Sequence, residues 1–148
     1  MRLTARELYD RDFFEWTQCN AALLRARRFD EADIEHLAEE VEDMGRRDRR
    51  ELTSRLEVLI THLLKWLAQP TRRERGGWRA TINTQRRRIL KLLGEMPSLS
   101  TALEENLAEV YRDAVKAAVD QTRLPKAAFS EACPITIDQI LNEEFFPE

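Results

Sequence analysis

The sequence contains few of the residues that interrupt helices and few of those that bind metals. Its 148 residues include four glycines, five prolines, two cysteines and two histidines. Scarce helix breakers favour long elements, and a chain of this length buries enough surface to fold as one domain without a disulfide or a structural metal. Two histidines exclude a three-histidine metal site, and the paired Glu-x-x-His motif of di-iron bundles is absent. We therefore expect neither a metal nor a cofactor.

Long apolar runs are also missing. No run approaches the roughly 18 residues that span a bilayer, so we expect no membrane segment. Residues 1–8 form a short polar N-terminus without the apolar segment of a signal peptide. Cys19 and Cys133 are far apart in the sequence and share no metal-binding spacing. We interpret both as reduced thiols in a cytoplasmic protein.

Apolar residues recur at steps of three and four over most of the chain, which is typical of amphipathic helices. The stripes predict one helix from Asp10 or Asp12 to Arg27, and others over residues 30–44, 52–67, 78–93, 98–118 and, briefly, 137–142. Gly45 either ends the second helix or kinks a longer one. No stretch alternates with period two, so we predict no sheet. The expected fold is all-α: one domain over residues 1–148, a bundle of about five helices with short connections and an irregular acidic segment at 124–148.

The stripe within residues 52–67 is the strongest in the chain. It is expected at the centre of the bundle, and its most buried members are predicted to be Leu56, Leu59, Leu63 and Trp66. Aromatic side chains supply large apolar areas, so we expect much of the core from Phe13, Phe14, Trp16, Trp66 and Trp78.

Catalytic signatures are scarce: the sequence has no glycine-rich phosphate loop, no G-x-S-x-G and no C-x-x-C. His62 lies on the most apolar stripe, where a lone histidine is usually a hydrogen-bonded core residue. It would act as a general base or ligand contact only with a carboxylate from another helix. The candidates for that carboxylate are Glu39, Glu40 and Glu42.

The other histidine, His36, lies in an acidic stretch. Asp33, Glu39 and Glu40 stand three or four residues from it, and a helix would bring them near its imidazole. His36 therefore either chelates an ion with one of them or lies on a solvated acidic face.

Charge is segregated along the chain. Residues 30–43 carry eight carboxylates and no lysine or arginine, whereas residues 72–91 carry eight lysines and arginines against Glu74 alone. Arginine and a helix N-terminus both favour an anionic group, so the residues considered for binding an anion or a partner are Arg73, Trp78, Arg79, Arg86 and Arg87. A nucleic-acid groove usually interleaves several aromatic residues with its bases, and this segment has one. We expect the basic and acidic segments to pair within the fold, and nucleic-acid binding to be weak.

Taken together, the order of several short motifs resembles the bacterial "domain of unknown function 29" family over almost the whole chain. The motifs are Tyr9-Asp10, Asp12-Phe13, Trp16, Leu24-Arg25, Glu39-Glu40, Glu42, Met44-Gly45, His62-Leu63-Leu64-Lys65-Trp66, Gln69-Pro70, Trp78, Thr81-Ile82, Pro97-Ser98-Leu99, Tyr111, Leu124-Pro125, Cys133-Pro134 and Phe146-Pro147. Two positions depart from the family pattern: Gly77 stands where a serine is usual, and Ser130 where a proline is common. The resemblance implies an all-helical bacterial protein and brings no activity, cofactor or catalytic residue.

Two functions remain open at this point. Segregated charge and amphipathic helices favour a non-catalytic module that binds another protein or a second copy of itself. The alternative is a small helical enzyme or metal-binding protein, with a pocket around His62 and the three glutamates.

Overall fold

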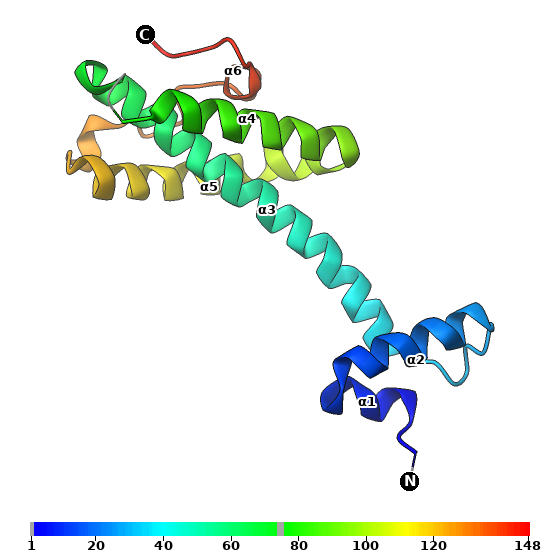
Figure 1. Cartoon of the computed structure of the whole chain (residues 1–148). Coiled ribbons are helices and arrows are strands. Elements are labelled where there is room, and N and C mark those ends of the chain that lie inside the picture. Colours follow the sequence, from blue (N-terminus) through cyan, green and yellow to red (C-terminus); the bar gives the residue numbers. More distant parts are fainter. Residues whose placement is uncertain (1, 74–75) are drawn as a thin grey trace. The chain divides into compact units, whose positions relative to one another are not determined.

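The structure, a computed structural model, describes residues 2–73 and 76–148, and its regular elements are all helical (Figure 1). They are α1 (Ala5–Arg11), α2 (Phe13–Arg25), α3 (Ile34–Ala68), η1 (Pro70–Arg72), α4 (Trp78–Glu95), α5 (Leu99–Thr122), η2 (Lys126–Ala128) and α6 (Ile137–Leu141), where η marks a 3-10 turn. No strand occurs within the described residues, which confirms the predicted all-α class. None of these helices is long and apolar enough to cross a membrane.

The contacts divide the chain into two compact units, Met1–Arg47 and Asp48–Glu148, and the boundary falls within α3. This helix runs for 35 residues and passes through Gly45 without a break. Of the two alternatives for Gly45, the end of a helix is wrong and the continuing helix is correct, since residues 34–68 form one helix. The prediction of a short helix near 137–142 is confirmed by α6.

The first unit begins with two helices where one was expected. Thr4 starts α1 by a reciprocal capping box with Glu7, so residues 5–8, assigned above to a polar terminus, are helical and bury Ala5 and Leu8. Asp12 ends α1 and caps α2 by accepting a hydrogen bond from the backbone N–H of Glu15. The helix predicted from Asp10 or Asp12 to Arg27 is thus α2, which follows its cap Asp12 and ends at Arg25, whereas α1 was not predicted.

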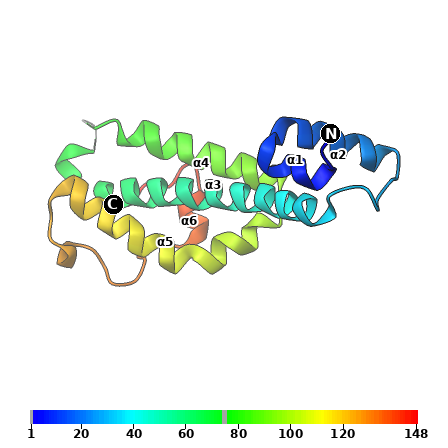
Figure 2. The same ribbon diagram turned by 90° about the horizontal axis from the view of Figure 1, so that it is seen from below.

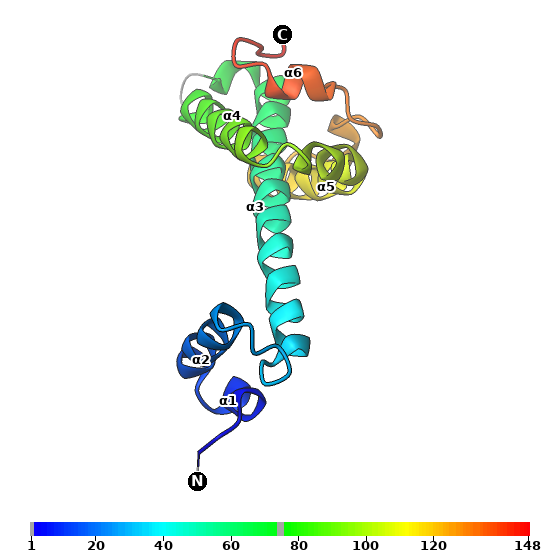
Figure 3. The ribbon, with the colours of Figure 1, turned by 90° about the vertical axis from the view of Figure 1, so that its right-hand side faces the viewer.

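The second unit is built around the last part of α3. α4 and α5 lie on two sides of it, and α6 packs on α4 (Figures 2 and 3). The four residues predicted at the centre of the bundle are buried, as are their neighbours on the same helix. The core of this unit also contains Ile82, Ile89, Ala114, Ala118 and Ile140.

The predicted contribution of aromatic residues is correct for the tryptophans and wrong for two phenylalanines. Trp16, Trp66 and Trp78 are buried, whereas Phe13 and Phe14 are largely exposed. The buried face of α2 contains Trp16 and Asn20, one turn apart. Phe13 packs against Trp16 and Tyr9 at the edge of this face and stays half exposed, whereas Phe14 is 73% exposed.

Removal of a central side chain tests the core of the second unit. Leu59→Ala should lower the free energy of unfolding by about 2–5 kcal/mol, because it leaves a cavity in a fully buried site. Ser54→Ala, an exposed position on the same helix, is the control and should change it by less than about 0.5 kcal/mol. Urea unfolding followed by circular dichroism measures both, and equal small losses would contradict the placement of Leu59.

Candidate functional site

A buried carboxylate organises the polar interior of the first unit. Asp33, 6% exposed, precedes α3, and its Oδ2 accepts a hydrogen bond from Trp16 Nε1 at 3.0 Å. Its own backbone N–H donates to Asn20 Oδ1 at 2.8 Å, and Asn20 Nδ2 donates to the carbonyl of Trp16 at 2.9 Å. His36 Nδ1 lies 2.6 Å from the same Asp33 oxygen. These bonds join α2 to the start of α3.

Tyr9 of α1 completes this cluster. Its ring stacks on the His36 imidazole, with 3.8 Å between centroids and 8° between planes, and meets Trp16 edge-on. Its hydroxyl donates to Glu40 Oε1 at 2.6 Å. This hydrogen bond, with burial and the charge of Glu40, raises the pKa of Tyr9 to about 12. All three helical segments of the unit therefore meet at Tyr9, Trp16, Asp33, His36 and Glu40, which we call the Asp33 cluster.

The charge of Asp33 is stabilised by its donors. Burial alone would raise the pKa of this carboxyl, but hydrogen bonds from Trp16 and His36 and the charge of His36 bring the pKa below its ordinary value. A histidine–carboxylate pair is a known element of acid–base and metal sites. Here, however, within residues 2–73 and 76–148, no group of three or more His, Cys, Asp or Glu side chains is placed to hold a metal ion.

The Asp33 cluster was only partly foreseen. The sequence offered His36 and Asp33 either as chelators or as part of a solvated acidic face, and the second interpretation is wrong for Asp33, which is buried. Asn20 was the available signal, because a polar residue on the apolar stripe of a helix needs a hydrogen-bonding partner when it is buried.

Asp33→Ala should destabilise the first unit by about 1–3 kcal/mol, since it leaves the buried Trp16 N–H without an acceptor. Because the pKa of Asp33 is lowered on folding, its contribution is present above a pH of about 4 and is lost as the pH falls through the folded-state value. Hydrogen exchange of residues 5–47 at neutral pH measures the effect. Glu35→Ala, which breaks only the exposed ion pair with Arg6, is the matched control and should leave the exchange nearly unchanged. Equal protection in both variants would contradict the role of Asp33.

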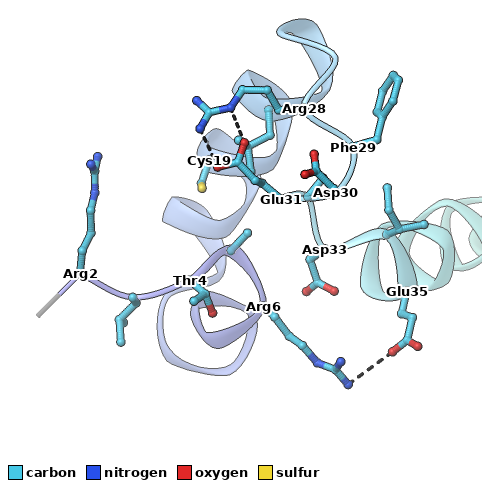
Figure 4. Close-up of a pocket in the computed structure, with 15 residues that line it drawn as sticks. Arg2, Thr4, Arg6, Cys19, Arg28, Phe29, Asp30, Glu31, Asp33 and Glu35 are labelled. Carbon is cyan, nitrogen blue, oxygen red and sulfur yellow. Dashed lines mark hydrogen bonds and ion pairs between the residues drawn. The ribbon is translucent and has the colours of Figure 1, made fainter.

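An open hollow of 790 Å³ lies beside this cluster (Figure 4). Its wall contains the ion pairs Arg6–Glu35, at 3.3 Å, and Arg28–Glu31. The free thiol of Cys19 also lines it. Two of the three arginines that line this hollow, Arg6 and Arg28, therefore bind carboxylates of the same unit.

His62 and the three candidate glutamates are not brought together by packing of one helix on another. All four lie on α3, and Glu40 precedes His62 by about six helical turns. His62 Nδ1 bonds to the carbonyl of Val58 at 2.9 Å, and burial, with the charge of Lys65, lowers the pKa of His62. Glu40 bonds to Tyr9, Glu42 pairs with Arg46 at 2.9 Å, and Glu39 is exposed. The enzyme alternative required one of these glutamates to reach His62 from a second helix, whereas all four residues lie on the same helix.

The arginine candidates of the basic segment interact mainly with the fold itself. Arg86 is fully buried in α4; its Nε donates to the carbonyl of Ile140 at 2.7 Å and its Nη2 to that of Gln139 at 3.2 Å. Burial lowers the pKa of Arg86, and the charge of Glu143 acts in the opposite direction. Arginine nevertheless stays protonated in proteins, so a buried cation satisfies the carbonyls at the end of α6.

Two further arginines stack on aromatic rings. Arg79 lies 4.9 and 4.4 Å from the ring centroids of Trp66 and Phe146, and these two rings also contact each other, with 4.7 Å between their centroids. Arg73 stacks on Trp66 and donates to its carbonyl at 2.8 Å. These ring–ring and guanidinium–ring contacts attach Phe146, near the C-terminus, to α3 and α4.

The remaining candidates differ from one another. Trp78 is buried in the core beneath the Lys65 ammonium group, whereas Arg87 is exposed. Arg87 lines a small hollow with Arg79, Asn83 and Phe146. Glu74 and Arg75, which belong to the basic segment, lie outside the described residues. The pairing of the acidic and basic segments stays a prediction.

Arg86→Ala should lower the free energy of unfolding by about 2–4 kcal/mol, because two carbonyls lose a charged donor inside the core. Arg87→Ala removes an exposed arginine one residue away and should change it by less than about 0.5 kcal/mol. Chemical unfolding gives both values, and hydrogen exchange over residues 137–147 should rise only in the first variant. If the two variants behave alike, Arg86 does not hold the C-terminal segment.

The fold and these clusters define a helical protein of two compact units, each with a buried charged side chain. A family model described as "Domain of unknown function DUF29" matches residues 8–146, and the chain belongs to this family. Comparison with curated proteins and with solved structures gave no match.

Proposed function

We propose that this chain is a non-catalytic protein-interaction module and that its first unit carries the interaction surface. The observation behind this proposal is the distribution of exposed hydrophobic residues. Ten large hydrophobic side chains are exposed within the described residues, and eight of them belong to the first unit. The eight are Leu3, Phe13, Phe14, Leu24, Phe29, Ile34, Val41 and Met44.

The degree of exposure supports a binding role. Phe14 is 73% exposed and Val41 is 61% exposed, although neither side chain gains from contact with water. Phenylalanine and methionine are enriched in the cores of protein interfaces, and concentrations of exposed apolar side chains mark interaction sites. The much longer second unit contributes only Val58 and Leu90 to the ten.

The buried ionisable groups favour a non-catalytic role, because their hydrogen bonds go to other groups of the same fold. Asp33 accepts hydrogen bonds within the first unit, and Arg86 donates to carbonyls within the second. Arg73, also a candidate for an anionic partner, donates to a carbonyl of the fold. We therefore favour a protein as the partner over a nucleic acid.

We place the module in the bacterial cytoplasm, as the family resemblance and the cysteines suggest. Both Cys19 and Cys133 are free. Burial raises the pKa of Cys133, and its thiol donates to the carbonyl of Ile135. A thiol held in its protonated form reacts slowly, which suits a reduced structural cysteine.

Site-specific photo-crosslinking in lysate of the native host tests the proposal. A photoreactive phenylalanine analogue replaces Phe14 or Val41 in the first unit, and Leu90 in the second unit is the matched control. We expect discrete, nuclease-resistant adducts with protein from the first two positions and none from Leu90. Unlabelled protein should suppress these adducts, while a Phe14→Glu/Val41→Glu variant should not. Adducts that nuclease removes, or equal adducts from all three positions, would contradict the proposal.

A further inference from the structure

The first part of α3 has the side-chain pattern of a helix that pairs with another helix. Ile34, Leu37, Val41 and Met44 follow at steps of three, four and three, which are the a and d positions of two heptads. Leu37 is half-buried, and the other three are at least 50% exposed. The fold of the first unit therefore leaves most of this stripe uncovered.

The charges along the same helix change sign near its middle. Residues 35–43 carry five carboxylates and no lysine or arginine, whereas residues 46–50 carry four arginines and one aspartate. A parallel partner of the same sequence would place acidic side chains opposite acidic ones. An antiparallel partner would place the acidic half of each helix opposite the basic half of the other, and opposite charges facing each other across an interface favour that orientation.

We propose that the stripe Ile34–Met44 binds the same stripe of a second copy of this chain, with the two α3 helices antiparallel. This inference rests on the proposed function and names its partner. Val41 and Met44 lie at the crossing point, next to the two-fold axis. The pairing buries their exposed side chains against those of the second copy.

Glu40 and Arg47 provide the polar contacts that fix this orientation. They are seven residues apart and flank the stripe on the same side, about 10.5 Å from each other along one helix. That separation is too long for an ion pair within the chain. In the antiparallel pair, Glu40 of each copy lies opposite Arg47 of the other, so both ion pairs form at once. Glu40 Oε1 accepts from Tyr9, and we assign Oε2 to the arginine.

The opposite flank of the stripe allows close approach of a second helix. Ala38 and Gly45 occupy equivalent positions one heptad apart there. A Cβ added to Gly45 would meet no atom within 4 Å, so the space beside it is open. Arg46, which precedes Arg47, already pairs with Glu42 and Asp43 on its own helix, and the proposed dimer does not require it.

Sedimentation equilibrium of the full chain tests the self-association. The wild type should be a dimer at micromolar concentration, and Val41→Glu/Met44→Glu should weaken the association by at least about tenfold. Leu90→Glu, a glutamate at an exposed hydrophobic position of the second unit, should remain a dimer. Circular dichroism confirms that each variant keeps its helix content.

Two further variant sets test the orientation. In a Cys19→Ser/Cys133→Ser background, Met44→Cys should form a disulfide between copies, because residue 44 lies beside the two-fold axis. Ile34→Cys should not, since antiparallel helices carry the two copies of residue 34 about 28 Å apart along the axis. Glu40→Arg and Arg47→Glu should each weaken the dimer, and the double variant should restore it. Tyr9→Phe, which removes only the internal hydrogen bond of Glu40, should dimerise normally.

The contradicting results separate this inference from the proposed function. A monomeric wild type whose Val41 position crosslinks to a different protein overturns the self-association and leaves the interaction module standing. A monomer with no specific adduct overturns both. Efficient disulfides from both Met44→Cys and Ile34→Cys would overturn the antiparallel arrangement.

Discussion

The uninterrupted course of α3 is the constraint on which both compact units depend. Each unit uses a different part of this helix, and the residues between those parts are largely exposed. Tertiary packing normally supplies most of the stability of a helix, so this stretch relies on local interactions and on its two packed ends. Arg46 pairs with Glu42 and Asp43, and Arg55 pairs with Glu51, at the spacings that stabilise a helix. The alternating acidic and basic residues along α3 thus help to stabilise the exposed part of this helix.

Buried charge serves the fold in both units, but in opposite ways. Asp33 is a buried anion that collects N–H donors, while Arg86 is a buried cation that donates to carbonyls. A buried charge is costly unless its hydrogen bonds are made. Both side chains have partners from separate segments of the chain, although Arg86 Nη1 is buried without one in the described part of the chain. Each of these residues therefore couples the position of one helix to the position of another. Their burial is a consequence of helix docking and does not require a substrate.

The hydrophobic pattern was sufficient for the fold class and for the interior of the second unit. Leu56, Leu59 and Leu63 were predicted from their stripe, because a stripe flanked by further apolar residues has no solvated alternative. The helix α1 was missed, because seven residues with two buried side chains are too few to show helical periodicity. Gly45 was ambiguous because a glycine permits a helix to end and equally permits it to continue.

The candidate sites were harder to predict, because residue type does not reveal the partner of a side chain. Arg86 and Arg87 are adjacent and chemically identical, yet one is buried beneath α6 and the other faces solvent. Clustered arginines suggested an anionic ligand, whereas carbonyls of the C-terminal segment and the rings of Trp66 and Phe146 occupy most of the candidates. Three arginines of the basic segment, Arg73, Arg79 and Arg86, thus serve as donors or stacking groups inside the protein.

The same uncertainty applies to apolar stripes and bears directly on function. Periodicity shows which face of a helix is apolar, but it does not show what covers that face. For Leu59 the cover is the rest of the second unit, whereas Val41 and Met44 on the same helix remain exposed. These exposed side chains contact water in the unfolded chain and largely still do in the folded monomer, so they add little hydrophobic free energy to folding. The hydrophobic free energy of burying this stripe is gained only when another surface covers it. In the proposed dimer the apolar stripe and the reversal of charge along α3 act together, since the first would supply affinity and the second orientation.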